Sequence, residues 1–219
     1  MEEKIKIKFN PELDAILNIK DGKFGLILAH GLRDDFDKGI LPFISKKLSE
    51  KKISSVRFRF PFKINNSKVV DQIGTLDESY LTVWRYVTEK FDNITWLVGG
   101  IDIGSKTAIR STGLMMMDTD TIPAIVSLNY PLYPPNRPEL VEASTLGAVM
   151  GDALFIQASN SNQGSFDRLK NSINMMIPHA DIKKINHADH EFNIENKTHD
   201  RVAFWISNDI ERYIRSIFG

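Results

Sequence analysis

The residues best suited to chemistry in this sequence are an aspartate between two glycines and a histidine near the C-terminus. Asp102 has Gly100 two positions before it and Gly104 two positions after it. This spacing is typical of a tight turn from a strand into a helix, where only small residues fit beside the central side chain. We therefore predict Asp102 as a candidate catalytic residue.

The chemistry open to Asp102 differs from that of a hydroxyl group. An aspartate side chain, whose ordinary pKa is about 3.9, is anionic at neutral pH and can attack without first losing a proton to a base. The backbone amide of Ile103 opens a helix, and its positive end can receive a developing oxyanion.

Composition excludes several other classes of function. The 28 basic and 28 acidic side chains balance, so no bulk field attracts nucleic acid or an anionic membrane surface. The chain has no cysteine, which removes disulfides, thiolate metal sites and a cysteine nucleophile. His187 and His190 are three positions apart but follow a strand, so we expect no metal, and no motif calls for a cofactor.

The elements that must position these residues alternate along the chain. An N-terminal pair of short runs, 4–9 and 15–19, predicts antiparallel strands at a sheet edge. After it, apolar runs alternate with stretches of helical periodicity, which indicates an α/β fold with a mostly parallel sheet and helices on both faces. We predict strands over 24–29, 54–60, 94–98, 122–128, 153–157 and 181–186, and helices over 41–52, 71–91, 104–117, 166–176 and 198–218.

Five motifs in order give the chain a resemblance to a known family. They are a His-Gly turn at 30–31, Arg-Phe-x-Phe-Pro at 57–61, the glycine-rich turn at 99–104, Tyr-Pro-Leu-x-Pro-Pro at 130–135 and Asp-His at 189–190. Together they resemble the α/β-hydrolase fold, in its small lidless branch related to dienelactone hydrolases, and within it the testis-expressed protein 30 type. The resemblance implies no large cap, and it implies the backbone of Leu32 as a second oxyanion donor beside Ile103.

The sequence departs from this family at two catalytic positions. Asp102 stands where the family has serine, and in this it resembles the aspartate-nucleophile branch of the same fold, which includes haloalkane dehalogenases and epoxide hydrolases. This resemblance implies displacement at a saturated carbon to form an ester on Asp102, and it implies His190 as the residue that activates the water that hydrolyses the ester. The family's triad acid falls, by counting from the strand at 153–157, on Ser161. His190 is therefore expected to lack its usual carboxylate partner. Tyr130 and Tyr133 are residues that could polarise an epoxide oxygen, although their motif is also present in the serine-containing family.

Two functions remain open for what we expect to be a single domain over residues 1–219. The first is a hydrolase that acts through Asp102 and His190 on a small ester-like or alkylating substrate. The alternative is a non-catalytic binding or assembly protein with a degenerate triad. A phosphate-binding loop at 99–104 is disfavoured because Asp102 would repel the phosphate. We expect a small-molecule substrate or ligand, no nucleic acid, no membrane and a cytoplasmic location, and we leave a homodimer open.

Overall fold

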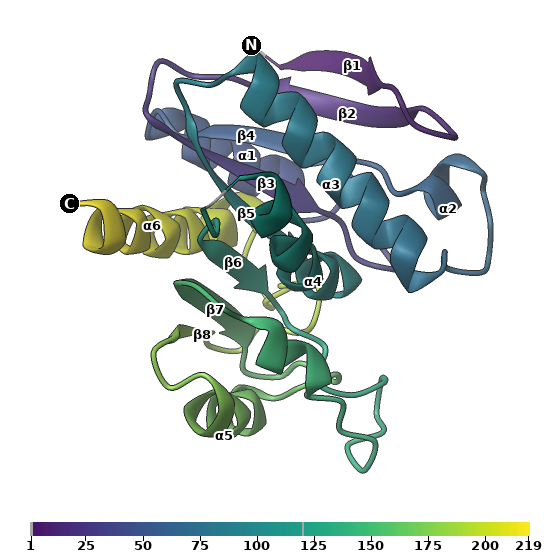
Figure 1. The fold of residues 1–219 in the computed structure, drawn as a ribbon. Coiled ribbons are helices and arrows are strands. Elements are labelled where there is room, and N and C mark those ends of the chain that lie inside the picture. The colour runs from purple at the N-terminus through teal and green to yellow at the C-terminus, as the bar shows by residue number, and fades with distance from the viewer. Residues whose placement is uncertain (1, 120) are drawn as a thin grey trace.

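A twisted sheet of eight strands forms the centre of the molecule, with the order β1-β2-β4-β3-β5-β6-β7-β8 (Figure 1). The computed structural model describes residues 2–119 and 121–219. The pairs β1–β2 and β2–β4 are antiparallel, and every other neighbouring pair is parallel. The strands are β1 (Glu3–Ile7), β2 (Leu13–Asn18), β3 (Phe24–Ala29), β4 (Ser54–Phe58), β5 (Thr95–Ile101), β6 (Ile125–Leu128), β7 (Ala153–Ala158) and β8 (Asp181–Ile185).

Helices cover both faces of this sheet. Helices α3, α4 and α5 lie on one face, and α1 and α6 lie together on the other (Figure 1). The helices are α1 (Leu41–Glu50), α2 (Pro61–Ile64), α3 (Ile73–Lys90), α4 (Ile103–Asp118), α5 (Phe166–Met176) and α6 (His199–Phe218), with a short 3-10 helix, η1 (Ser144–Ala148).

The core is divided into two layers by the sheet itself. Along β3, Ile27 packs into the layer beneath α3 and α4, whereas Leu26 and Leu28 pack into the layer beneath α1 and α6. Successive side chains of a strand point to opposite faces, so a strand covered on both sides must be apolar throughout. This explains the uninterrupted apolar run at 24–29, which identifies β3 as a central strand.

The order of strands places a crevice between the ends of β3 and β5. The chain leaves β3 for α1 on one face of the sheet and leaves β5 for α4 on the other. Loops that depart in opposite directions from neighbouring parallel strands open a crevice at their carboxyl ends, where α/β proteins bind ligands. The residues after Ala29 and Ile101 therefore meet at this point.

The predicted fold class is confirmed, including the antiparallel N-terminal edge pair and the absence of a large cap. The differences are local. Strand β5 continues to Ile101, so Gly99 and Gly100 belong to the strand and not to the loop after it. The short helices α2 and η1 were not predicted, and η1 is the one helix that the structure describes between β6 and β7. Within the described ranges, no helix is long and apolar enough to cross a bilayer.

Candidate active site

Asp102 occupies the sharp turn between β5 and α4. Its backbone has φ 56° and ψ −124°, a conformation that non-glycine residues rarely adopt and that costs about 1–3 kcal/mol. Its amide donates to Leu128 O (3.1 Å), and its carbonyl accepts from Ser105 N (3.0 Å). The turn is therefore held from β6 on one side and from the first turn of α4 on the other.

Gly104 permits the close approach on which this turn depends. A Cβ built at Gly104 would lie 2.4 Å from Ala29 O, and one at Gly100 would lie 2.6 Å from the carbonyl carbon of Gly104. Real side chains do not pack at such distances, so helix α4 can begin this close to β3 only with glycine at both positions. The spacing seen in the sequence thus has a steric cause.

One carboxylate oxygen of Asp102 is held by the backbone after β3. Leu32 N donates to Asp102 Oδ2 at 2.9 Å, and the Asp102 residue is 6% exposed. Leu32 N is the amide that the resemblance implied as an oxyanion donor. With Oδ2 occupied by this donor, Oδ1 is the oxygen nearer to His190.

His190 lies between Asp102 and Ser161. Its Nε2 atom is 3.6 Å from Asp102 Oδ1, and its Nδ1 atom is 2.8 Å from Ser161 Oγ. Nε2 is buried and has no hydrogen-bond partner among the described residues. The structure therefore brings together the candidate nucleophile, the candidate base and the serine at the position expected for the triad acid.

Ser161 Oγ is itself fixed by the backbone. It accepts a hydrogen bond from Gln163 N at 3.2 Å and belongs to a buried residue, 5% exposed. When Ser161 Oγ also accepts from His190 Nδ1–H, the lone pair of the imidazole lies on Nε2, toward Asp102. Ser161 can thus orient the ring and fix its tautomer, but as a neutral group it does not stabilise an imidazolium as a carboxylate does.

Asn129, which sequence reasoning missed, holds the loop that carries His190. Its Nδ2 donates to His190 O (2.6 Å) and its Oδ1 accepts from Ala158 N (2.7 Å), so it connects the ends of β6 and β7 to the histidine loop. Its φ of 42° turns the chain after β6, and asparagine tolerates this region better than most residues. The signal in the sequence that could have identified Asn129 was an asparagine directly after a buried strand.

His30 supports the same crevice from the end of β3. Its ring is fully buried, with Nδ1 2.7 Å from Gly31 O and Nε2 accepting from Phe60 N at 3.0 Å. These two bonds require a neutral ring with the proton on Nδ1. Burial lowers the pKa of His30 to about 4, which outweighs the opposing effect of the Gly31 carbonyl. His30 is therefore a structural link between the loops after β3 and β4.

A cleft of about 400 Å³ opens beside Asp102. Apolar side chains from the loop after β3, from α3 and from the segment after β6 form part of its wall, and three of them are Leu32, Ile73 and Tyr133. Residues of α4 form another part, namely Ile103, Lys106 and Arg110. The cleft offers the Asp102 carboxylate, a largely apolar wall and cations along one helix.

The charges and phenols around the cleft are shaped by burial. Burial raises the pKa of the Asp34 carboxyl, and the neighbouring Glu191 and Asp102 carboxylates add to the rise. Burial also raises the pKa of Tyr130, whose side chain is fully enclosed and does not line the cleft, whereas Tyr133 does. Of the two tyrosines predicted as candidates for polarising an epoxide, Tyr133 is thus the one that borders the cleft.

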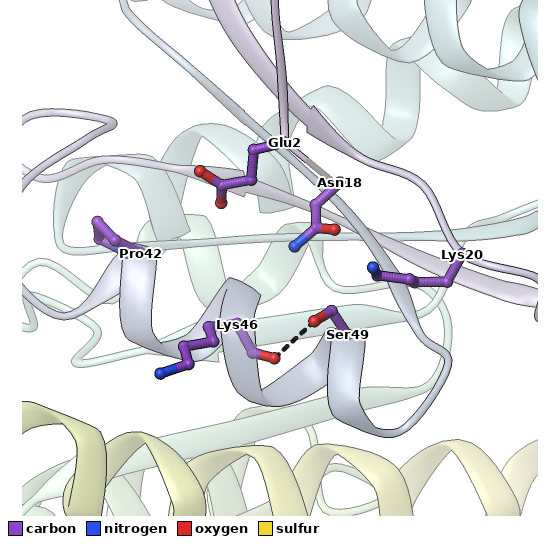
Figure 2. A pocket seen from close by; sticks show the side chains of 6 residues that line it. All are labelled: Glu2, Asn18, Lys20, Pro42, Lys46 and Ser49. Carbon is purple, nitrogen blue, oxygen red and sulfur yellow. Dashed lines mark hydrogen bonds between the residues drawn. The ribbon is translucent and has the colours of Figure 1, made fainter.

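A second cleft of about 330 Å³ lies between β2 and α1 and shares no residue with the first. Figure 2 shows its six lining side chains, among which Ser49 Oγ donates to Lys46 O at 2.8 Å within α1. Glu2, in the same cleft, pairs with the buried Arg57 guanidinium (2.5 Å). No group of three or more His, Asp or Glu side chains in the described ranges is placed to hold a metal ion.

The fold and the turn at Asp102 define a protein of the α/β-hydrolase class. Residues 22–216 match the family model described as an alpha/beta hydrolase domain, and the chain belongs to this family. Solved structures to which the chain is similar share its fold, whereas its place in the small lidless branch, and within that in the testis-expressed protein 30 type, stays a prediction. No curated protein matches the chain in sequence.

Three solved structures illustrate this similarity. An alpha-beta serine hydrolase homologue from Coxiella burnetii has a TM-score of 0.76 at 15% identity, over 95% of this chain and 97% of that one. A dienelactone hydrolase from Anabaena variabilis has 0.73 at 17% identity, over 97% and 98%. A serine hydrolase without a lid from Xanthomonas campestris has 0.71 at 12% identity, over 98% and 94%. At these identities the likeness concerns the fold.

Proposed function

We propose that this chain hydrolyses small ester-like or alkylating substrates through a covalent intermediate on Asp102. The observation that carries the proposal is the hydrogen bond from Leu32 N to Asp102 Oδ2, which divides the carboxylate into two roles. Oδ2 sits against a backbone donor, and Oδ1 lies on the side of His190. The cleft beside Asp102 supports a chemical role for this carboxylate, because a purely structural role in the turn would not require one.

In the first step, Asp102 Oδ1 attacks a saturated carbon of the substrate. The Oδ1–carbon bond forms as the bond to the leaving group breaks, and the leaving group departs with the electron pair. The product of this step is an ester between the substrate carbon and the Asp102 carboxyl group. Leu32 N–H remains on the carbonyl oxygen of that ester, which polarises it for the next attack.

In the second step, water hydrolyses this ester. His190 Nε2 removes a proton from the water as its oxygen attacks Cγ of Asp102, and the negative charge that develops on Oδ2 is stabilised by Leu32 N–H. Collapse of the tetrahedral intermediate expels the alkoxide, which takes the proton from His190 and leaves as an alcohol. The Asp102 carboxylic acid then releases the second proton of the water to solvent and returns as a carboxylate that contains one oxygen from water.

The alternative is a binding or assembly protein without turnover. The observation that favours it is the contact of His190 Nδ1 with Ser161 instead of a carboxylate. Loss of the triad acid lowers turnover about 10⁴-fold in serine proteases, so a weak base at this position slows the second step. The two functions make opposite predictions for a variant at position 102.

The decisive variant is Asp102→Asn, with Asp37→Asn as a control that removes an exposed carboxylate of equal charge. Alkyl sulfonate esters, alkyl halides and epoxides, which all carry a leaving oxygen or halide on a saturated carbon, are offered to both. We expect Asp102→Asn to lose at least about 10³-fold in kcat/KM on any substrate that the wild type turns over, since the attacking oxygen is gone. Asp37→Asn should match the wild type.

Isotope labelling then identifies the attacked atom. A single turnover in water enriched in heavy oxygen should place the label in the peptide that contains Asp102, because the attacking water oxygen is retained by the carboxylate. Turnover that Asp102→Asn leaves unchanged, or a label found only in the product, contradicts the mechanism. Absence of turnover on all three substrate types supports the binding protein.

A further inference from the structure

The wall that α4 contributes to the cleft carries two cations with different partners. Ile103, Lys106 and Arg110 follow one another at helical spacing, and all three line the cleft that begins at Asp102. A substrate that reaches Asp102 lies along this stripe. The state of each cation therefore decides what charge the substrate can carry.

Arg110 is already neutralised. Its guanidinium pairs bidentately with Asp77, with Nη2 2.7 Å from Oδ1 and Nε 3.1 Å from Oδ2. Both side chains are largely shielded, at 20% and 13% exposure. Planar two-point pairs of this kind are geometrically specific and strong, so a ligand would gain little by competing for Arg110.

Lys106 has a weaker partner. Its side chain is 13% exposed and lies over the Tyr130 ring, whereas the Glu142 carboxylate, 2.9 Å from Nζ, belongs to a side chain that is 62% exposed. Among the residues that the structure describes, Glu142 is the one carboxylate within ion-pair distance of Lys106. Exposed carboxylates contribute about 0–1 kcal/mol to such pairs, so another anion can displace Glu142 at small cost.

The other carboxylates in the cleft limit how many negative charges an incoming ligand can carry. Asp102 and Asp71 also line it, which places carboxylates near any ligand. A single negative charge can be offset by Lys106, while a second would be repelled by its neighbours. Most of the remaining wall is apolar, with Leu32 39% and Ile73 62% exposed and free to be covered by a ligand.

We propose that Lys106 binds the carboxylate of a substrate that carries an apolar body and one acidic group, and that this carboxylate takes the place of Glu142. One part of this proposal rests on the proposed function, namely that the bound acid is a substrate whose reactive carbon lies at Asp102. Binding of the acid does not depend on the proposed function, because it needs only the cleft and Lys106. Lys106 is thus the residue that selects acidic over neutral substrates.

The test measures binding without any reaction. Phenylbutyrate and its neutral counterpart phenylbutyramide are titrated by calorimetry against the wild type, Lys106→Met, Lys106→Arg and Glu142→Gln. We expect the wild type to favour the acid, Lys106→Met to lose about tenfold in affinity for the acid but not for the amide, and Lys106→Arg to retain the preference. Glu142→Gln should bind the acid several-fold more tightly because the competing carboxylate is gone. Lys38→Met, which removes an exposed lysine, serves as the control.

The outcomes separate this inference from the proposed function. Equal binding of acid and amide by the wild type, or unchanged acid binding by a folded Lys106→Met variant, overturns the inference. If Lys106→Met does not fold, weaker or unchanged acid binding by Glu142→Gln overturns it instead. If the protein prefers the acid but turns over no substrate, the inference about Lys106 is supported and the hydrolase function is not. If turnover depends on Asp102 but the acid is not preferred, the hydrolase function is supported and the inference about Lys106 is overturned.

Discussion

At the scale of single residues, the partner of His190 determines how well the candidate site can complete a cycle. Asp102 needs no base for its own attack, so the first step does not depend on Ser161. Hydrolysis of the ester does, because His190 Nε2 becomes positively charged as it takes the proton from water. Ser161 Oγ, 2.8 Å from Nδ1, offers no negative charge to stabilise that state.

Ser161→Asp is therefore expected to accelerate the second step. A carboxylate against Nδ1 strengthens Nε2 as a base, and Gln163 N, now bonded to Ser161 Oγ, is placed to donate to it. We expect the rate of ester hydrolysis to rise about tenfold to hundredfold, part of the 10⁴-fold that a triad acid contributes elsewhere. Rapid-quench kinetics on a substrate that shows a burst measures this step separately from the first.

Ser161→Ala and Ser172→Asp are the matched controls. The alanine variant removes the partner of Nδ1 and should slow the same step, while Ser172→Asp adds a charge on α5 and should leave it unchanged. A gain confined to the first step, or a gain equal in Ser172→Asp, would show that Ser161 does not act through His190.

The sequence was sufficient to select Asp102, Leu32 and Ser161, which lie together in the structure, although their catalytic roles stay predictions. The glycine spacing predicts the turn at Asp102, while the family resemblance implies Leu32 after the His-Gly pair and Ser161 by counting from β7. Asn129 could not be predicted in this way. Its role depends on a positive φ after β6 and on the approach of the histidine loop, which is set by the pairing of β6 with β7 and not by any local pattern.

At the scale of elements, helix α4 connects the candidate nucleophile to the core. It begins against Ala29 O and continues over the sheet, where Ala108 and Ile109 are fully buried. Three of its residues, Ile103, Lys106 and Arg110, line the cleft, and its later turns serve packing. A substitution at its start should therefore disturb both stability and chemistry, whereas one at an uncrowded position near its end should leave the chemistry unchanged.

Gly104→Ala and Gly113→Ala, two identical changes in this helix, test that division. A Cβ at Gly104 meets Ala29 O at 2.4 Å, so we expect a loss of at least about 1–3 kcal/mol in the free energy of unfolding. A Cβ at Gly113 meets nothing within 4 Å, so Gly113→Ala should gain about 0.5–1 kcal/mol from the higher helix propensity of alanine. Urea unfolding followed by circular dichroism measures both.

Most elements were predictable because their apolar periodicity extends over several residues. The short helix α2, which begins at Pro61, and η1 have too few turns to show such a pattern. The last residues of β5 were predicted as loop because Gly99 and Gly100 weaken a strand by propensity. Pairing with Ala29 on β3 and Ser127 on β6 extends the strand through Gly100 regardless of that propensity.

At the scale of the whole molecule, His30 makes stability depend on pH. Because burial lowers its pKa to about 4 from an ordinary value of 6.5, the unfolded chain binds a proton more readily than the folded one. The stabilisation is fully present above pH ~6.5 and is lost as the pH falls toward ~4. The raised pKa values of Asp34 and Asp77, both caused by burial, act in the opposite direction.

We expect this one histidine to remove about 3 kcal/mol from the free energy of unfolding between pH ~7 and ~4. His30→Gln, which can donate to Gly31 O and accept from Phe60 N with its amide, should be less stable at neutral pH but should lose less on acidification. Urea titrations of both proteins across this range give the difference in slope. His199→Gln, at a partly exposed histidine, is the control and should follow the wild type. Parallel curves for wild type and His30→Gln would refute the assignment.

The backbone of Asp102 also has a consequence for how selection acts on this chain. At φ 56° and ψ −124° a glycine would relieve the strain, and it would also remove a buried carboxylate from the end of the sheet. Proteins that retain such a destabilising residue commonly exchange stability for activity at that position. A lineage in which residue 102 had no task would gain stability from drift toward glycine.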